Sequence, residues 1–325
     1  MIKTRFTERF ALDHAIALAP MAMASGGRLA GAVSDAGGLG FIGGGYGDEA
    51  WLETEFAAAG NRPVGCGFIT WSLAKQPDLL AMALARKPLA LMLSFGDPLP
   101  FAPAIHDAGA ALFCQIQTLD HGREAIDAGA TVIVAQGTEA GGHGGDRATV
   151  TLVPEVADLL AARAPETLLL AAGGIADGRG LAAALMLGAD GVLMGSRFWA
   201  SEEALVHDSF QQAALAADGD ATLRTRVPDI VRKLDWPASF TVRSLRNEFT
   251  DRWHGREDAL LEVAEQEAAR YSAAAKSGDP TIVGVLVGEA AGLITDIPAA
   301  ADILARISRD AETLLFEKAP GFARA

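Results

Sequence analysis

The sequence predicts an α/β fold, a (β/α)8 TIM barrel with a helical appendage inserted before the last barrel helix. Eight short apolar runs recur along residues 15–196. Most of them are apolar at consecutive positions, which is typical of parallel strands covered on both faces. The segments between them have helical periodicity and end at glycines. This alternation favours a closed barrel over an open doubly wound sheet, because no antiparallel pattern accompanies it.

The order of strands and helices along the chain indicates which loops would form the candidate site. The expected strands cover residues 15–20, 39–43, 64–68, 89–94, 111–116, 131–136, 168–174 and 191–196. Helices are expected between them, for example over 26–37, 120–130 and 177–189. In barrels of this kind the site is built from the loops at the carboxyl ends of the strands. We therefore look for chemistry at the residue where each apolar run ends.

Residues 205–280 differ in composition from the rest of the chain. They carry more charge, have helical periodicity and contain Trp236 and Trp253. We expect this segment to form the appendage, or a lid, while residues 1–204 and 281–325 form the barrel. The end of the chain would supply the closing helix. We interpret both tryptophans as core residues of the appendage.

Charge and cysteine content exclude several classes of function. Lysine and arginine number 27, aspartate and glutamate 41, so the net charge is −14. Such a surface repels phosphate backbones, which argues against nucleic-acid binding. Cys66 and Cys114 lie inside apolar runs and are expected to be buried thiols rather than metal ligands or a disulfide, as in a reducing cytoplasm. We see no signal peptide and no uninterrupted apolar run of roughly 20 residues that would span a membrane.

A glycine-rich loop follows the sixth expected strand. Gln136 ends the strand, and the stretch "GTEAGGHGGD" that comes next contains His143. Glycines allow positive φ and let a flat ligand approach the backbone closely. The alternative is a surface loop with an incidental histidine. Glu139 is expected to lie behind the site or to face solvent.

The seventh and eighth expected strands end in small residues. They end in Gly173-Gly174 and in Gly195-Ser196. The loops after these two strands commonly bind a phosphate through backbone N–H groups, and Ser196 adds a hydroxyl donor. The alternative is close packing of helix on strand by glycine. A phosphate site of this kind suits a mononucleotide cofactor, for which FMN is the usual choice, and Met21 at the first strand end could place its sulfur against a flat ring.

Together these residues resemble the nitronate monooxygenase family, once called 2-nitropropane dioxygenases. The resemblance rests on "APM" at 19–21, "AVSDAGGLG" at 32–40, "AQGTEAGGHGG" at 135–145, "AAGGIADGRG" at 171–180 and "LMGSRF" at 193–198. It implies an FMN-containing barrel enzyme that oxidises alkyl nitronates, or nitroalkanes, with O₂. The sequence departs from the family at Gly67, where members often carry an asparagine near the flavin. One expected polar contact is therefore missing.

The resemblance also implies roles for single residues. His143 would be the catalytic acid/base, because a neutral imidazole with a reference pKa near 6.5 can take or return a proton near neutral pH. Met21 would lie by the flavin ring. The residues that would contact the flavin or hold its phosphate end are Gln136, Gly141, Gly173, Gly174, Leu193, Met194, Gly195 and Ser196.

Two other functions stay open on the sequence. FMN-dependent enoyl-acyl-carrier-protein reductases and an NADH:quinone reductase share the histidine loop, and the stretch "VRSLRN" at 242–247 leans toward them. In such a reductase Arg243 and Arg246 could meet a nucleotide or carrier phosphate; otherwise they are solvated or salt-bridged. A catalytically silent flavin-binding protein is the third possibility. We expect a small-molecule substrate and O₂ as partners, with His207 as a candidate substrate contact, and leave NAD(P)H use and a homodimer open.

Overall fold

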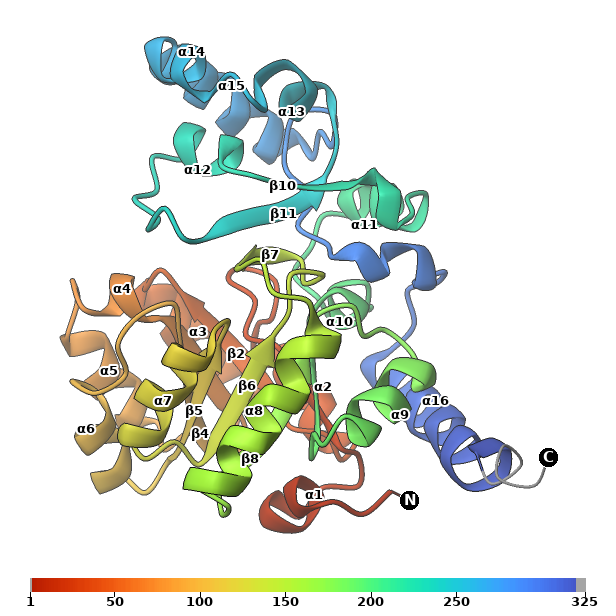
Figure 1. Cartoon of the computed structure of the whole chain (residues 1–325). Helices are drawn as coiled ribbons and strands as arrows, with labels where there is room; N and C mark the ends of the chain where they lie inside the picture. The colour runs from red at the N-terminus through yellow and green to blue at the C-terminus, as the bar shows by residue number, and fades with distance from the viewer. Residues whose placement is uncertain (1, 320–325) are drawn as a thin grey trace.

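The computed structural model describes residues 2–319 and shows eight parallel strands curled into a barrel, with a second group of elements over one end (Figure 1). The strand order is β1-β9-β8-β6-β5-β4-β3-β2, and every pairing along it is parallel. A parallel bridge between Ala17 and Leu39 joins the two ends of this order. The predicted barrel is therefore confirmed.

The elements follow the predicted alternation. The barrel strands are β1 (Ile16–Leu18), β2 (Phe41–Gly45), β3 (Gly65–Ile69), β4 (Ala90–Ser94), β5 (Ala111–Ile116), β6 (Val132–Gln136), β8 (Leu168–Ala172) and β9 (Gly191–Met194). The helices around them are α1 (Arg5–Phe10), α2 (Gly27–Asp35), α3 (Glu49–Ala59), α4 (Thr70–Leu73), α5 (Asp78–Ala85), α6 (Ala102–Asp107), α7 (Leu119–Asp127), α8 (Thr149–Arg163), α9 (Gly178–Met186), α10 (Ser196–Trp199) and α16 (Ala300–Glu312). A π-helical turn, η3 (Thr313–Lys318), extends α16.

The strands are buried on both faces, which explains their continuous apolar runs. One set of side chains fills the barrel interior and includes Phe41, Met92 and Phe113. The alternate set faces the helices and forms the larger core. Helix α1, which the sequence analysis did not predict, packs Phe6 and Phe10 against this interior cluster. The end of the barrel near α1 is thus filled with apolar side chains, and the opposite end is left for chemistry.

Helix α16 is the last helix of the barrel. It packs on α9 and α2 and lies beside α9 in Figure 1. The buried guanidinium of Arg197, on α10, forms an ion pair of 3.0 Å with Asp296, and Asp296 also pairs with Arg306 on α16 at 2.7 Å. These bonds tie the loop after β9 to the closing helix.

Residues 205–280 form most of the group of elements above the barrel, and the returning segment 281–299 runs along them (Figure 1). They comprise α11 (Asp208–Leu215), η1 (Gly219–Ala221), β10 (Thr222–Thr225), α12 (Val227–Val231), β11 (Thr241–Leu245), α13 (Glu248–Trp253), α14 (Glu257–Glu262), α15 (Ala264–Ser277) and η2 (Glu289–Leu293). The appendage is mostly helical, but it also has two strands that the sequence analysis missed. They form an antiparallel sheet, β10-β11-β7, with β7 (Gly142–Gly144) from the histidine loop of the barrel.

We propose the division of the chain that the sequence suggests, with 205–280 as the appendage and the remainder as the barrel. The ends of that division, residue 1 and residues 320–325, lie outside the described residues. Leu245 N–H donates to the carbonyl of Val285, so the returning chain after residue 280 stays attached to the appendage sheet before it reaches α16.

Both cysteines are buried free thiols, as predicted. Burial raises the pKa of Cys66 and of Cys114 to about 12, so neither is a thiolate at neutral pH. Within residues 2–319, no helix combines the length and the apolar character that crossing a bilayer requires.

Candidate active site

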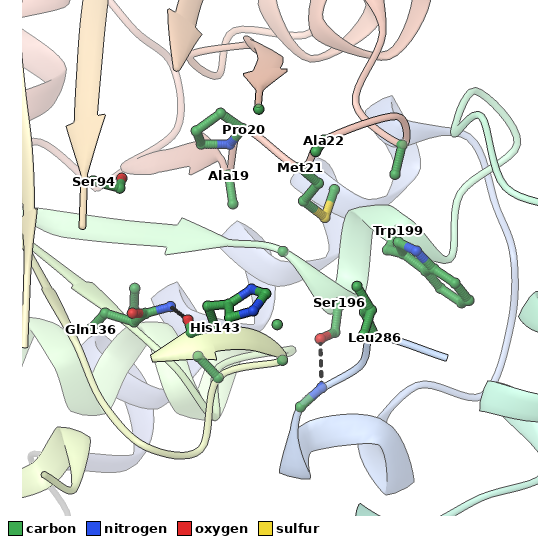
Figure 2. A pocket seen from close by; sticks show the side chains of 18 of the residues that line it. Ala19, Pro20, Met21, Ala22, Ser94, Gln136, His143, Ser196, Trp199 and Leu286 are labelled. Atoms are coloured by element: carbon green, nitrogen blue, oxygen red, sulfur yellow. Dashed lines mark hydrogen bonds between the residues drawn. The ribbon is translucent and has the colours of Figure 1, made fainter. Parts of the chain in front are cut away.

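A cavity of about 420 Å³ lies at the carboxyl ends of the barrel strands and reaches up to the appendage. Its volume falls in the range of small-molecule sites. Of the residues singled out from the sequence, it brings together Met21, Gln136, Gly141, His143, Gly173, Gly174, Leu193, Gly195 and Ser196. Figure 2 shows Met21 and Pro20 on one side of this space and Gln136, His143 and Ser196 on the other.

Met194 is the exception among the predicted residues. It does not line the cavity, and its side chain is buried in the core between barrel and helices. Successive side chains of a strand point to opposite faces, so Leu193 and Gly195 face inward and Met194 faces the helices. Met194 could therefore help to hold the phosphate end only through its backbone, and its role in the run from Leu193 to Ser196 stays a prediction.

The side chain of Gln136, at the end of β6, is oriented by hydrogen bonds to two other glutamines and to the histidine loop. The Oε1 atom of Gln136 accepts hydrogen bonds from the amides of Gln115, at 3.2 Å, and Gln117, at 2.9 Å. Its Nε2 atom donates to the carbonyl of His143 at 3.0 Å, a bond drawn in Figure 2. One amide hydrogen of Gln136 is left for a ligand in the cavity. The network also fixes the backbone that carries His143.

His143 lies on β7, the short strand that the glycine-rich loop forms. Strand β7 pairs with β11, where His143 is opposite Val242. The Nε2 atom of His143 lies 3.0 Å from each carboxylate oxygen of Asp229, which belongs to α12. The two side chains are only 8% and 5% exposed. Burial lowers the pKa of His143 below its usual value, and the Asp229 carboxylate acts in the opposite direction.

Aromatic rings enclose the imidazole. Trp236 stacks on His143 with ring centroids 3.5 Å apart and planes 7° apart. The indole N–H of Trp236 donates to the Tyr46 hydroxyl at 3.0 Å, and Phe95 and Phe240 pack against the indole in T-shaped, edge-to-face contacts. The prediction that Trp236 belongs only to the core of the appendage is wrong, because its ring is a wall of the cavity.

The ends of β8 and β9 form a cradle of small residues. Gly173 has φ +101°, which only glycine adopts without strain. A methyl group added at Gly195 would project into the cavity, 3.6 Å from the Met21 sulfur. The Ser196 hydroxyl accepts from the N–H of Gly288 at 3.0 Å (Figure 2), so its own hydrogen is available to a ligand. This arrangement fits a phosphate group at the end of the cavity that the sequence indicated.

Two arginines of the appendage hold the histidine loop. Arg224 and Arg243 both donate to the carbonyl of Thr138, at 2.9 and 3.0 Å, and Arg243 also forms an ion pair of 2.8 Å with Glu289. Burial, followed by the neighbouring Arg243, lowers the pKa of Arg224 to about 10. Arg246, by contrast, is exposed and pairs with Asp251. Neither Arg243 nor Arg246 is among the residues that line the cavity.

The third strand explains the departure from the family pattern. Gly67 lines the cavity, but a Cβ atom there would lie 2.4 Å from the Pro20 side chain. The ring of Pro20 therefore takes the space that a side chain at position 67 would need.

Sequence reasoning missed the partner of His143 and several residues that line the cavity. Asp229 carried no signal, because it meets His143 across 86 positions of the chain. Tyr46 and Phe95 follow β2 and β4, so a search of every strand end would have found them.

His207 does not line the cavity; it caps α11 instead. Glu139 accepts hydrogen bonds from the backbone and hydroxyl of Thr149. The described part of the chain holds no cluster of His, Cys, Asp or Glu suited to a metal ion.

Comparisons with known proteins agree on one family for this chain. Residues 69–310 match the family described as nitronate monooxygenase. The chain is 32% identical to a nitronate monooxygenase of Neurospora crassa, over 90% of this chain and 88% of that protein. Among solved structures it resembles FabK from Thermotoga maritima, with a TM-score of 0.87 and 30% identity over 99% of this chain and all of the other. It also resembles a nitroalkane oxidase from Streptomyces ansochromogenes, with a TM-score of 0.79 and 25% identity over 95% and 98% of the two chains.

The matched segment runs from the end of β3 to α16 and includes the histidine loop, both small-residue strand ends and the appendage. The family consists of FMN-dependent flavoenzymes. The chain belongs to the nitronate monooxygenase family and is an FMN-dependent oxidoreductase.

Proposed function

We propose that this protein oxidises alkyl nitronates, and nitroalkanes after their deprotonation, with O₂. One observation carries the proposal: a buried histidine lines a cavity made of barrel strand ends, opposite Met21 and beside a cradle of small residues. A nitroalkane has an acidic C–H next to its nitro group, and its anion is a nitronate. A histidine that removes that proton must lie in the site and be neutral at working pH, and its protonated form can then return the proton.

The residues present fit the cofactor of the family. Gly195 and Ser196, with Gly173 and Gly174, would hold the phosphate end through backbone N–H groups and the Ser196 hydroxyl. Figure 2 shows Met21 on the side of the cavity opposite Gln136 and His143. Met21 would lie by the flat ring, and Gln136 and Gly141 would contact it, as would the buried strand end at Leu193. Bound FMN supplies the electron transfer between substrate and O₂, while the protein supplies position and polarity.

His143 serves as the acid/base group. Burial lowers its pKa, so the ring is neutral at neutral pH and can accept a proton from a nitroalkane carbon. Trp236 and Phe95 pack against the ring, so apolar surface borders the site of this proton transfer. The ring can then donate the same proton, or orient the nitro group by a hydrogen bond.

The two arginines that could meet a nucleotide or carrier phosphate in a reductase have partners within the protein. Arg243 is bound to Thr138, Thr222 and Glu289, and Arg246 to Asp251. No guanidinium of this pair is left in the cavity for a nucleotide phosphate. Arg232 does line the cavity, so the NAD(P)H-dependent reductase remains the second candidate function.

The test is oxygen uptake by the FMN-loaded protein with a nitroalkane and, separately, with its preformed nitronate. We expect His143→Ala to reduce turnover of the neutral nitroalkane by about 10²- to 10⁴-fold, the usual contribution of a general base. Turnover of the nitronate should fall less, because its proton has already left. Full turnover of both substrates by the variant would show that His143 has no such role.

A further inference from the structure

The histidine of the cavity is held by a residue from the appendage. Asp229 lies on α12, and β10 and β11 of the same appendage pair with β7, the strand of His143. The carboxylate and the imidazole are thus brought together by elements that no local sequence pattern connects. The contact is also the one side-chain hydrogen bond that Asp229 forms within residues 2–319.

Geometry fixes which ring nitrogen is protonated. An ionised carboxylate only accepts hydrogen bonds, and both oxygens of Asp229 lie 3.0 Å from Nε2 of His143. The proton of a neutral His143 is therefore on Nε2. Within the described residues no hydrogen bond reaches Nδ1. Stacking on Trp236 prevents the ring from rotating out of this plane.

Burial makes this contact strong. The carboxylate of Asp229 is 5% exposed, so burial has removed its water, and separation from His143 would leave a buried charge without a partner. The charged and titratable neighbours come from other elements. Arg224 on β10 and Arg232 after α12 lower the pKa of the imidazole, and Asp229 raises it. Tyr46 after β2 and Tyr271 on α15 are neutral at working pH, because burial raises the pKa of each hydroxyl.

We propose that Asp229 is a positioning residue that holds the proton on Nε2 of His143 and so makes Nδ1 the atom that exchanges a proton with the substrate. This inference rests on the proposed role of His143 in turnover. It assigns the appendage a direct part in the proton chemistry. Asp229 would orient the catalytic base His143 as the third residue of a catalytic triad orients its histidine.

The main test is Asp229→Asn in the FMN-loaded protein. Asparagine keeps the shape, but its NH₂ group can donate to Nε2 and place the ring proton on Nδ1. We expect turnover of a neutral nitroalkane to fall about 10²-fold or more, with KM and flavin content nearly unchanged. The acid limb of the pH profile of the remaining activity should move to lower pH, because the negative charge that raises the pKa of His143 is gone. Asp229→Glu should restore part of the activity.

The matched control is Asp251→Asn. Asp251 lies on α13 of the same appendage, and its ion pair with Arg246 is more than half exposed. This variant should keep wild-type turnover and pH profile. A loss of thermal stability in Asp229→Asn with unchanged turnover and pH profile would mean a purely structural role and would overturn the proposal.

A second measurement does not depend on a folded variant. The ¹⁵N chemical shifts of histidine-labelled, FMN-loaded wild-type protein report which ring nitrogen of His143 carries the proton. The Nε2–H tautomer is expected, and the Nδ1–H tautomer would overturn the proposal. His143→Ala distinguishes failure of the proposed function from failure of this inference. Full turnover in His143→Ala would overturn both the proposed function and the inference. Loss of turnover in His143→Ala with unchanged turnover in Asp229→Asn would overturn the inference alone.

Discussion

His143 shows how its surroundings set the chemistry of one residue. Burial favours its neutral form, and Asp229 opposes this effect without cancelling it, since the net shift of the pKa is downward. The residue therefore stays a base at a lower pH than an exposed histidine.

This shift predicts the pH dependence of activity. With a neutral nitroalkane, kcat/KM should be constant near neutral pH and should fall on the acid side with a midpoint below about 6.5, the usual pKa of histidine. The fall comes from protonation of the base in the free enzyme. His143→Ala should lack this limb. A midpoint well above 6.5 in the wild-type protein would contradict the assignment.

Ser196 tests the phosphate end of the cavity. Ser196→Ala removes one hydroxyl donor, and a hydrogen bond to a charged group contributes about 1.5–3 kcal/mol. We expect FMN to bind about 10- to 100-fold more weakly, measured by quenching of flavin fluorescence. Thr54→Ala is the control, since that hydroxyl bonds only to Ala50 of its own helix. Equal affinities of the two variants would place the phosphate elsewhere.

Gly67 tests the departure from the family. Gly67→Asn should not restore a flavin contact, because its Cβ atom would collide with Pro20. We expect a loss of about 1–3 kcal/mol in the free energy of unfolding, as for other overpacked sites. Gly109→Asn is the control, since nothing lies within 4 Å of a Cβ atom added there and asparagine is among the residues that best tolerate its positive φ. A Gly67 variant as stable as the control, with tighter FMN binding, would refute this explanation.

At the scale of elements, the appendage works by holding the histidine loop. Strand β7 is too short to be stable alone, and β11 and the two arginines on Thr138 fix it. Arg243→Ala removes one of the two arginines that donate to the Thr138 carbonyl and leaves Glu289 without its ion-pair partner, which should cost about 1–3 kcal/mol of stability and reduce turnover. Arg246→Ala should cost less than about 1 kcal/mol, because its ion pair is exposed. Thermal unfolding of both variants compares these values. Equal effects would mean that the loop does not depend on Arg243.

The barrel elements were predictable because their signals are local. Eight apolar runs and glycine stops specify strands and helices within a few residues of each other. Strands β10 and β11 were not predicted, because Arg224, Arg243 and Ser244 interrupt their apolar pattern and their partner strand is a glycine loop. The run from Leu193 to Ser196 was treated as one block, whereas strand alternation turns the Met194 side chain toward the helices.

At the scale of the whole molecule, the site needs both parts of the chain. The barrel supplies the cradle, Gln136 and His143, and the appendage supplies Trp236 and Asp229. Strand ends could be found from the sequence, but a partner 86 positions away could not, since only the fold brings it near. The cavity is lined by residues of the barrel and of the appendage, so a cofactor bound in it would contact both parts of the chain.

FMN should therefore stabilise the folded chain as one unit. At a free FMN concentration of about 100 times its Kd, the expected gain is about 2.7 kcal/mol, seen as a higher Tm with a single transition. Calorimetry with and without added FMN measures it. Two separate transitions, of which FMN moves only one, would contradict the shared site.

The most direct test of the central claim is the flavin absorbance of the FMN-loaded protein without oxygen. We predict no change on adding NADH or NADPH, and a rapid change on adding an alkyl nitronate. Rapid bleaching by either pyridine nucleotide, with no response to the nitronate, would contradict the account and identify a reductase.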